Sequence, residues 1–236
     1  MIPLKDNLPT RHVPIVTLLL IGINAYVFLR VFLREFLFGS HVGQRYLLYY
    51  GLIPCSLTGN CVVSGRAFSP EVTLLTSMFV HAGFFHFAGN MLYLWIFGNN
   101  VEDSMGKIRF AVFYLLCGAG AAYAQILMGP DSRIPMVGAS GAISGVLGAY
   151  VLLFPHARVL TLIPIFFFIT FQEIPAMLVL GFWIVVQLLN GFLTFESQGG
   201  GVAWFAHIGG FVAGFLLIGL FKRRTVPWGW QRHRSW

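Results

Sequence analysis

Six long apolar stretches constrain the fold of this chain more than any other feature of its sequence. Most of them approach or reach the ~20 residues that an α-helix needs to cross the ~30 Å hydrocarbon core of a bilayer. Because their apolar residues run continuously instead of alternating with polar ones, they predict helices and not the strands of a β-barrel. The predicted spans are residues 14–33, 77–99, 109–128, 139–154, 174–193 and 203–221.

The composition indicates a polytopic membrane protein. Of the 236 residues, 57% are hydrophobic and 10% are charged, whereas a soluble domain has about 25% charged residues. This leaves no room for a sizeable soluble domain, and we predict an all-α protein in three parts. They are a cytoplasmic N-terminal lead (1–13), a six-helix core (14–221) and a basic cytoplasmic tail (222–236). The first span lacks a small-residue cleavage site at its end, so we expect it to be retained and not removed as a signal peptide.

The formal net charge of +7 gathers at the ends of the predicted helices, which indicates a membrane topology and not a nucleic-acid partner. Six spans place both termini on one side, and the basic residues favour that side by ten to four. Since cytoplasmic loops carry the excess of Lys and Arg, we expect both termini in the cytoplasm. The ten are Lys5, Arg11, Lys107, Arg109, Arg158, Lys222, Arg223, Arg224, Arg232 and Arg234, and the four are Arg34, Arg45, Arg66 and Arg133.

Two segments outside the spans leave alternatives open. Residues 34–73 form the longest loop, and their RYLLYYGLIP stretch suits a short interfacial helix or hairpin, because Tyr rings favour the headgroup level. The same loop holds Cys55 and Cys61, which form either a disulfide, if the loop faces an oxidising compartment, or two free thiols. Residues 159–171 contain Pro164 and are short for a crossing, so we expect an interfacial segment or an extension around the helix end. A seventh span there would move the tail outside, against the charge bias.

Polar residues interrupt three of the predicted spans. Ser140 lies in the GASGAISG stretch that opens the fourth span. His86 and Asn90, in the second span, are four residues apart and therefore share one helix face. His207 lies four residues into the sixth span, about 6 Å below its start. The three spans run in one direction, so these side chains lie at similar depth, where polar groups are costly and usually retained for a function.

This constellation has the parts that serine-based acyl transfer needs. A serine hydroxyl is a weak nucleophile until a neighbouring base takes its proton, and His207 is the candidate base for Ser140. The Asn90 amide, the His86 imidazole and the free N–H groups at the start of the fourth helix are candidate donors to the oxyanion, each worth roughly 3 kcal/mol. No acidic residue is evidently placed to orient His207. We therefore expect a Ser–His dyad with the imidazole held by packing. No carboxylate or thiol accompanies the histidines, so no metal site is expected.

Glycines on the fourth and sixth spans predict a close approach of the two helices. Gly141, Gly145 and Gly148 share one face of the fourth span, and Gly138 lies just before it. On the sixth, Gly210 and Gly214 form a GxxxG pair that shares a face with His207. Such a contact would bring Ser140 and His207 within hydrogen-bond reach, although small residues of this kind are also common where helices merely pack.

The motifs together resemble those of the rhomboid intramembrane serine proteases. They are HFAGN with the upstream His81, then GASG, then AHIGGFVAG, in this order on alternate spans. The resemblance covers residues 14–221. It implies a six-transmembrane-helix bundle around a water-filled cavity that opens to the outside.

The resemblance also implies roles and an activity. Ser140 would be the nucleophile and His207 the base, and His86, Asn90 and the Ser140 backbone N–H would form the oxyanion hole. The family cleaves single-span membrane proteins near the outer membrane surface and uses no metal, nucleotide or other cofactor. The expected partners are therefore transmembrane protein substrates and the lipid bilayer. The compact chain suggests a bacterial plasma membrane, and the sequence does not indicate an oligomeric state.

The chain departs from some relatives at two places. It lacks a Trp-Arg pair in the first loop, and it has Ser144 where an aromatic residue would stack on the histidine. His81 is expected to have a structural role and not a catalytic one. The fifth span and the ESQGGG link that follows it are candidates for controlling access to the site.

Two other functions compete with proteolysis. A rhomboid-like pseudoprotease would bind membrane helices without cleaving them, but such relatives typically lack the Ser–His pair. A small transporter would line its pathway with polar residues. Here the polar residues lie only in the outer halves of the spans, and no inverted repeat is evident.

Overall fold

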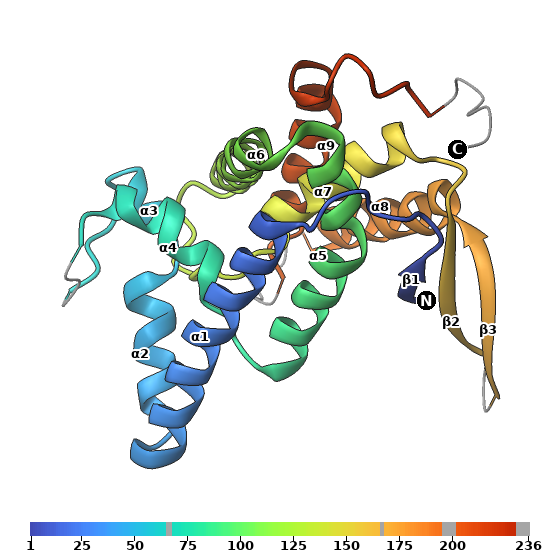
Figure 1. Cartoon of the computed structure of the whole chain (residues 1–236). Helices are drawn as coiled ribbons and strands as arrows, with labels where there is room; N and C mark the ends of the chain where they lie inside the picture. The colour runs from blue at the N-terminus through green and yellow to red at the C-terminus, as the bar shows by residue number, and fades with distance from the viewer. Residues whose placement is uncertain (65–67, 166–167, 195–201, 230–236) are drawn as a thin grey trace.

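A computed structural model of the chain describes residues 1–64, 68–165, 168–194 and 202–229. The ESQGGG link, Arg66 and the end of the predicted basic tail, with Arg232 and Arg234, lie outside these ranges. Helices dominate the fold (Figure 1), and the long ones are α1 (Ile15–Phe38), α5 (Phe84–Met105), α6 (Lys107–Met128), α7 (Ser140–Leu153), α8 (Ala176–Leu193) and α9 (Trp204–Phe221). The short ones are α2 (His41–Tyr50), α3 (Pro54–Leu57), α4 (Thr73–Thr76) and the 3₁₀ turns η1 (Pro70–Val72) and η2 (Ser77–Phe79).

Among the described residues, four helices are long and apolar enough to cross a membrane: α1, α6, α8 and α9. A fifth crossing is counted if α5 is joined to the segment Pro70–Phe79, from which it is bent by 80°. Helix α7 is apolar but has only 14 residues, which span about 21 Å at 1.5 Å per residue. The predicted helical membrane fold is therefore confirmed, while the count of six crossings stays a prediction.

Four of the six predicted spans coincide with long helices to within about two residues; the first, 14–33, ends too early because α1 continues to Phe38, and the second is wrong at both ends. It was expected at 77–99, whereas α5 begins at Phe84 and continues to Met105. The stretch before α5 is bent, so His81 precedes the helix instead of lying within it. At the other end α5 continues to Met105, and the next residue, Gly106, has a φ of +87° that ends the helix. Residues 100–105, predicted to be a link, are therefore the last turns of α5.

An acidic residue in these last turns, Glu102, accepts hydrogen bonds from the start of α1. These bonds compensate for burying a carboxylate in the helix. Glu102 is buried and accepts hydrogen bonds from the backbone N–H of Val16 at 3.0 Å and of Thr17 at 2.8 Å. The Thr17 hydroxyl adds a third at 2.8 Å. A carboxylate at this position satisfies N–H groups that have no acceptor within α1 and interacts favourably with its dipole.

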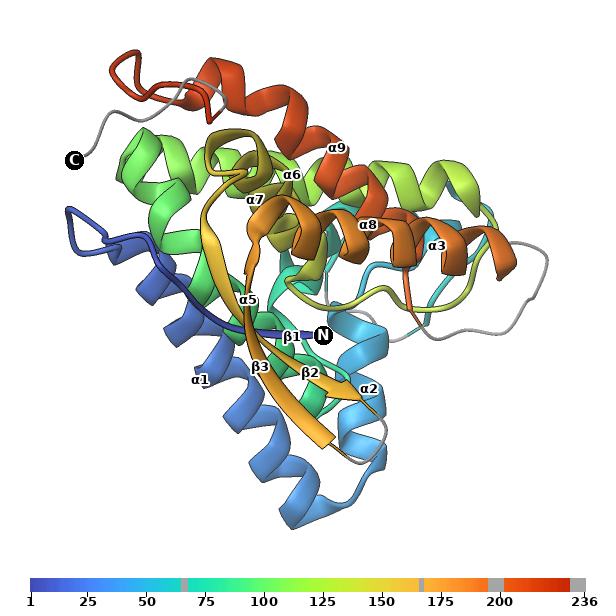
Figure 2. The same ribbon diagram turned by 90° about the vertical axis from the view of Figure 1, so that its right-hand side faces the viewer.

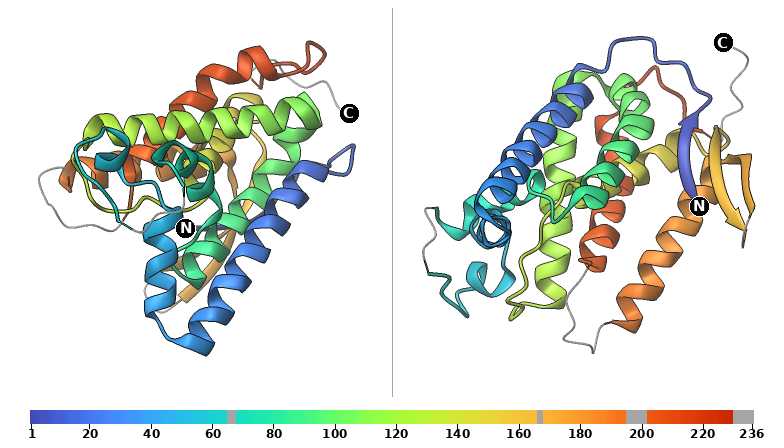
Figure 3. Two further views of the ribbon diagram at one scale, coloured as in Figure 1. Left: turned by 90° about the vertical axis from the view of Figure 1, so that its left-hand side faces the viewer. Right: turned by 90° about the horizontal axis from the view of Figure 1, so that it is seen from below.

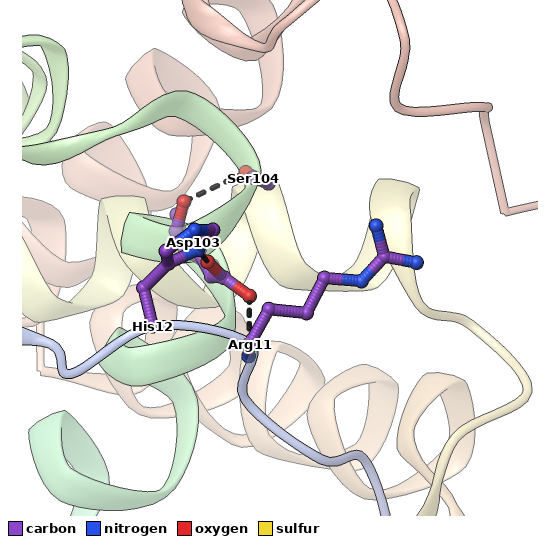
Figure 4. A network of polar contacts seen from close by, with 5 residues as sticks. Arg11, His12, Asp103 and Ser104 are labelled. Atoms are coloured by element: carbon purple, nitrogen blue, oxygen red, sulfur yellow. Dashed lines mark hydrogen bonds and ion pairs between the residues drawn. The ribbon is translucent and has the colours of Figure 1, made fainter. Parts of the chain in front are cut away.

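Asp103 binds the segment just before α1. Its carboxylate accepts the backbone N–H of Arg11 at 2.9 Å and lies 2.7 Å from Nδ1 of His12 (Figure 4). The backbone N–H of Arg223, just after α9, donates to the carbonyl of Ser104. The segments that flank the helical core thus meet at one end of the bundle, which we call the terminal end, and the opposite end is the distal end.

Helix α7 is the centre of the core. It packs against α5, α6 and α9, and α6 and α9 run alongside each other over it (Figure 2). Ten of its 14 residues are buried, which explains how a helix shorter than a bilayer is accommodated. Aromatic rings close the core near the terminal end, where Tyr150 meets Phe97 edge-on with ring centroids 4.9 Å apart.

A three-stranded antiparallel sheet is a feature that the sequence interpretation missed. Its strands are β1 (Ile2–Asp6), β2 (Arg158–Ile165) and β3 (Phe168–Pro175), in the order β1-β2-β3. The sheet lies at the edge of the helical bundle, beside the start of α8 (Figure 3). The expectation that residues 159–171 extend a helix is therefore wrong. The segment is rich in β-branched and aromatic residues, and Pro164 is unfavourable inside a helix. Because the hairpin returns to its starting side, it is not a seventh span.

Asp6 at the end of β1 attaches the sheet to the helices. Its Oδ2 accepts hydrogen bonds from the Tyr150 hydroxyl of α7 and from Nδ2 of Asn100 on α5, both at 2.6 Å. Burial raises the pKa of the Asp6 carboxyl above its usual range, and the hydrogen bonds, which lower it, only partly offset this effect. The N-terminal lead, expected to be a simple polar segment, thus carries a buried polar contact.

We predict that Asp6→Asn removes a pH dependence of stability. Between the ordinary carboxyl pKa near 3.8 and the raised native value, the native state binds more protons than the unfolded state, so the stability of the wild type falls as pH rises. The asparagine keeps an accepting oxygen and does not titrate. The unfolding temperature of the variant minus that of the wild type, measured in detergent, should therefore be larger at about pH 7 than at about pH 4. A difference that is constant, or that moves the other way, contradicts the prediction.

Candidate active site

Ser140 and His207 face each other at the distal end of the bundle. Ser140 is the first residue of α7, and His207 lies in the first turn of α9. The Ser140 Oγ is 2.8 Å from Nε2 of His207, a hydrogen-bond distance, and both side chains are half-buried. The two residues are 67 positions apart in the chain, so the fold alone brings them together.

Backbone contact between α7 and α9 makes this approach possible. A Cβ atom added to Gly210 would overlap the carbonyl oxygen of Gly141, and one added to Gly214 would overlap that of Gly145. One added to Gly148 would overlap the carbonyl oxygen of Phe211. Only glycine allows such close approach, so the predicted glycine faces do lie in the helix contact.

On its other side α7 packs against small residues of α6. A Cβ on Gly141 would come within 2.6 Å of the Ala121 Cβ, and one on Gly145 would overlap the buried Cys117 side chain. Cys117 is thus a packing residue. Helix α7 is held between α6 and α9, which fixes the position of Ser140.

The candidate oxyanion residues meet at the backbone that leads into α7. Gly138 has a φ of +112°, and a Cβ there would lie 2.6 Å from Nε2 of His86 and 3.4 Å from Nδ2 of Asn90. Nδ2 of Asn90 is buried and has no hydrogen-bond partner within the described part of the chain. Because α7 begins at Ser140, the N–H of this residue belongs to the first turn, where N–H groups lack acceptors within the helix. The side chains of His86 and Asn90 therefore meet beside the backbone that leads into Ser140.

His81 supports this arrangement from outside the helix. Its buried ring meets the His86 ring edge-on, with centroids 5.2 Å apart, and the Phe87 ring at 5.6 Å. Among the described residues its ring contacts are with His86 and Phe87. Within the described residues no group of three or more His, Cys, Asp or Glu side chains is placed to hold a metal ion.

The structure corrects the expectation that packing holds the His207 imidazole. Nδ1 of His207 lies 2.8 Å from Oε1 of Gln187, a buried residue of α8. Gln187 was not among the site residues predicted from the sequence. The sequence offered one indication: Gln187 is four residues after Trp183, so an aromatic and a polar side chain share one face of the fifth span.

Aromatic rings around His207 come from an unexpected place. Trp183 on α8 lies 5.9 Å from the imidazole, and Trp204 at the start of α9 meets it edge-on at 6.2 Å. Ser144, where some relatives have an aromatic residue, is buried and donates its hydroxyl to the carbonyl of Ser140 at 2.6 Å. The two tryptophans thus lie beside the imidazole of His207, where an aromatic residue at position 144 would otherwise stack.

The long distal loop holds the segment that precedes Ser140. Cys55 and Cys61 form a disulfide, which decides the alternative that the sequence left open. The loop pairs with residues 130–138 through reciprocal backbone hydrogen bonds between Leu52 and Met136 and through the Cys55 N–H to the carbonyl of Ser132. The RYLLYY part of the stretch RYLLYYGLIP forms the C-terminal part of helix α2. Of the two predicted alternatives, a short helix or a hairpin, the helix is therefore confirmed for these residues.

Fold and site together define a helical membrane protein in which a serine and a histidine from separate helices form a hydrogen-bonded pair. The chain belongs to the rhomboid family, since the profile of the Rhomboid domain matches residues 70–224. That range includes Ser140, His207, His86 and Asn90.

Several characterised proteins are similar to this chain. RHOMBOID-like protein 1 of Arabidopsis thaliana is 33% identical over 166 residues, which cover 66% of this chain and 38% of that protein. Rhomboid protein 1, mitochondrial, of Saccharomyces cerevisiae is 29% identical over 171 residues, covering 69% and 45%. Rhomboid protease GluP of Bacillus subtilis is 34% identical over 145 residues, covering 61% and 24%. The chain thus matches less than half the length of each of these relatives.

We predict that Gly210→Ala destabilises the protein and that Gly181→Ala does not. The new methyl group at position 210 meets the Gly141 backbone, which cannot move aside, whereas nothing lies within 4 Å of a Cβ at position 181 on α8. Overpacking of this kind costs about 1–3 kcal/mol. Unfolding of both variants in detergent measures the difference. Equal stability of Gly210→Ala and the wild type would show that α7 and α9 are not held in backbone contact.

Proposed function

We propose that this chain is an intramembrane serine endopeptidase that cleaves transmembrane proteins with Ser140 and His207. The observation that carries the proposal is the 2.8 Å contact between the Ser140 Oγ and Nε2 of His207. The family membership and the similarity to a protein named a rhomboid protease agree with it. A binding protein without activity would have no need for a serine and a histidine in this geometry.

The proposed reaction proceeds through an acyl-enzyme. The Ser140 Oγ attacks the carbonyl carbon of the scissile peptide bond while Nε2 of His207 takes the hydroxyl proton. The C–N bond then breaks, and the same proton passes to the leaving amine. Water, deprotonated by His207, attacks the ester that remains on Ser140, and proton return to Ser140 restores the starting state. Protons and charge balance over the cycle, and no cofactor takes part.

Negative charge on the attacked carbonyl oxygen requires donors that are already in place. The Ser140 backbone N–H, the His86 imidazole and Nδ2 of Asn90 are the proposed oxyanion hole. The Asn90 amide supports this role because a buried N–H donor without a partner costs free energy in the resting protein. An oxyanion would satisfy it only during the reaction, which is the condition for transition-state stabilisation.

The length of α7 indicates where substrates are cut. At about 21 Å it is shorter than the ~30 Å hydrocarbon core, so a serine at its N-terminus lies below the distal membrane surface. Peptide bonds reach such a site from within the bilayer or just above it. We therefore propose that substrates are single-span membrane proteins, cut near the outer membrane surface.

The proposed topology places the terminal end in the cytoplasm and the distal end outside. The excess of basic residues at the terminal end supports it. The Cys55–Cys61 disulfide provides independent support, because it lies at the distal end and disulfides persist in oxidising compartments. We propose a bacterial plasma membrane as the location.

We predict that Ser140→Ala and His207→Ala each abolish cleavage of a model single-span substrate. Each change removes a group that the reaction needs, and the loss should approach the detection limit, about 10³-fold or more. Ser144→Ala is the matched control, since this serine is on the same helix and its recorded bond is to the helix backbone. The measurement is cleavage by purified protein in lipid vesicles. Full activity of either Ser140→Ala or His207→Ala would refute the proposed mechanism.

Labelling by a fluorophosphonate probe separates a protease from an inactive relative. An activated Ser140 should react, and the label should disappear in Ser140→Ala and persist in Ser144→Ala. Insertion and thermal stability of the variants are measured in parallel. A wild-type protein that inserts and folds but is not labelled would favour the pseudoprotease alternative.

We predict that Asn90→Leu lowers kcat by about 10²-fold and leaves KM within about two-fold. Leucine has nearly the shape of asparagine but donates no hydrogen bond. Because the donor acts only on the developing oxyanion, its loss affects the chemical step and not substrate binding. Steady-state kinetics over a range of substrate density in vesicles give both constants. A change confined to KM would indicate that Asn90 binds substrate and is not part of the oxyanion hole.

A further inference from the structure

Gln187 makes a polar contact on the side of His207 that faces away from Ser140. The Gln187 side chain is 5% exposed, and its Oε1 lies 2.8 Å from Nδ1 of His207. It comes from α8, whereas the histidine is on α9 and the serine on α7. The imidazole is therefore held between side chains of two other helices, one at each ring nitrogen.

The direction of these hydrogen bonds follows from a third contact. Nε2 of Gln187 donates to the carbonyl oxygen of Trp183 at 3.2 Å. A carbonyl only accepts, so the amide nitrogen must face Trp183 and the amide oxygen must face the imidazole. This fixes the orientation of the glutamine without reference to the histidine.

The same reasoning then fixes the proton of the imidazole. The amide oxygen of Gln187 only accepts, so Nδ1 of His207 must carry the hydrogen. In the neutral ring Nε2 is then the acceptor, and it lies 2.8 Å from the Ser140 Oγ. The hydroxyl of Ser140 can donate to it. This is the tautomer that a base for Ser140 requires.

We propose that Gln187 is a positioning residue that holds His207 in the Nδ1–H tautomer, with Nε2 directed at Ser140. The proposal rests on the proposed function, in which His207 is the base. Trp183 contributes two contacts. Its backbone carbonyl accepts the hydrogen bond from Gln187, and the centroid of its ring lies 5.9 Å from that of the His207 imidazole.

The test compares three substitutions on α8. Gln187→Met keeps the length of the side chain but has no strong acceptor for Nδ1–H. Gln187→Glu keeps an accepting oxygen in either protonation state. Asn190→Leu is the matched control, since Asn190 lies on the same helix and its amide donates to the carbonyl of Val186 at 2.8 Å without contacting His207.

We predict that Gln187→Met lowers kcat on the single-span substrate by about 10- to 100-fold, with KM unchanged within about two-fold. Residues that hydrogen-bond the second nitrogen of a metal-ligating histidine typically change activity by about 10- to 100-fold when they are replaced. We expect an effect of the same order for the residue that orients a histidine base. Gln187→Glu should recover most of kcat, and Asn190→Leu should retain it. A loss caused by poor folding would instead appear in thermal stability and would not be rescued by glutamate. Wild-type kcat in Gln187→Met overturns the proposal.

A second readout does not depend on proteolysis. The ¹⁵N spectrum of histidine-labelled protein distinguishes the two neutral tautomers, and His207→Ala identifies the signals of position 207 among the seven histidines. The wild type should show the proton on Nδ1, and Gln187→Met should show a mixture of tautomers. An unchanged tautomer in Gln187→Met overturns the proposal. If the wild type shows no Ser140-dependent cleavage, the proposed function fails, while these spectra still decide the role of Gln187.

Discussion

The contact between α7 and α9 is made by backbone against backbone, and the rest of the structure depends on it. Gly210 and Gly214 leave room for the carbonyls of Gly141 and Gly145. Two helices that approach this closely carry Ser140 and His207 at their first turns within hydrogen-bond distance. In a bilayer the hydrophobic effect does not drive helices together, so packing of this kind must supply much of the attraction. The glycines therefore determine both the cohesion of the bundle and the geometry of its polar site.

Buried polar groups at the two ends of the bundle have different purposes. At the terminal end every acceptor described above has donors: Glu102 receives the first N–H groups of α1, and Asp6 receives Tyr150 and Asn100. These contacts fix the order and tilt of the elements. At the distal end Asn90 keeps a donor without a partner within the described residues. The polar groups are thus satisfied at the terminal end, whereas the distal end keeps a donor that is free to bind an acceptor.

The sequence predicted the helices and the pairing better than it predicted the connections. Continuous apolar runs located most of the long helices, because length and hydrophobicity are local properties. The depth of Ser140 and His207 followed from counting along parallel spans. The sheet and the extended end of α5 were missed, because they depend on partners distant in sequence: β1 pairs with β2 across more than 150 residues, and Glu102 is acceptable in a helix only because α1 begins beside it. The contact of Gln187 with His207 was missed, since only the fold brings α8 against α9.

The glycine contact has a mechanical consequence. Side chains that interdigitate can change rotamer and let two helices slide, but carbonyl groups that fill the place of missing side chains cannot. We therefore expect α7 and α9 to move as one stiff body when bilayer thickness or lateral pressure changes, so that the distance between Ser140 and His207 varies less with the lipid than the positions of the elements around them.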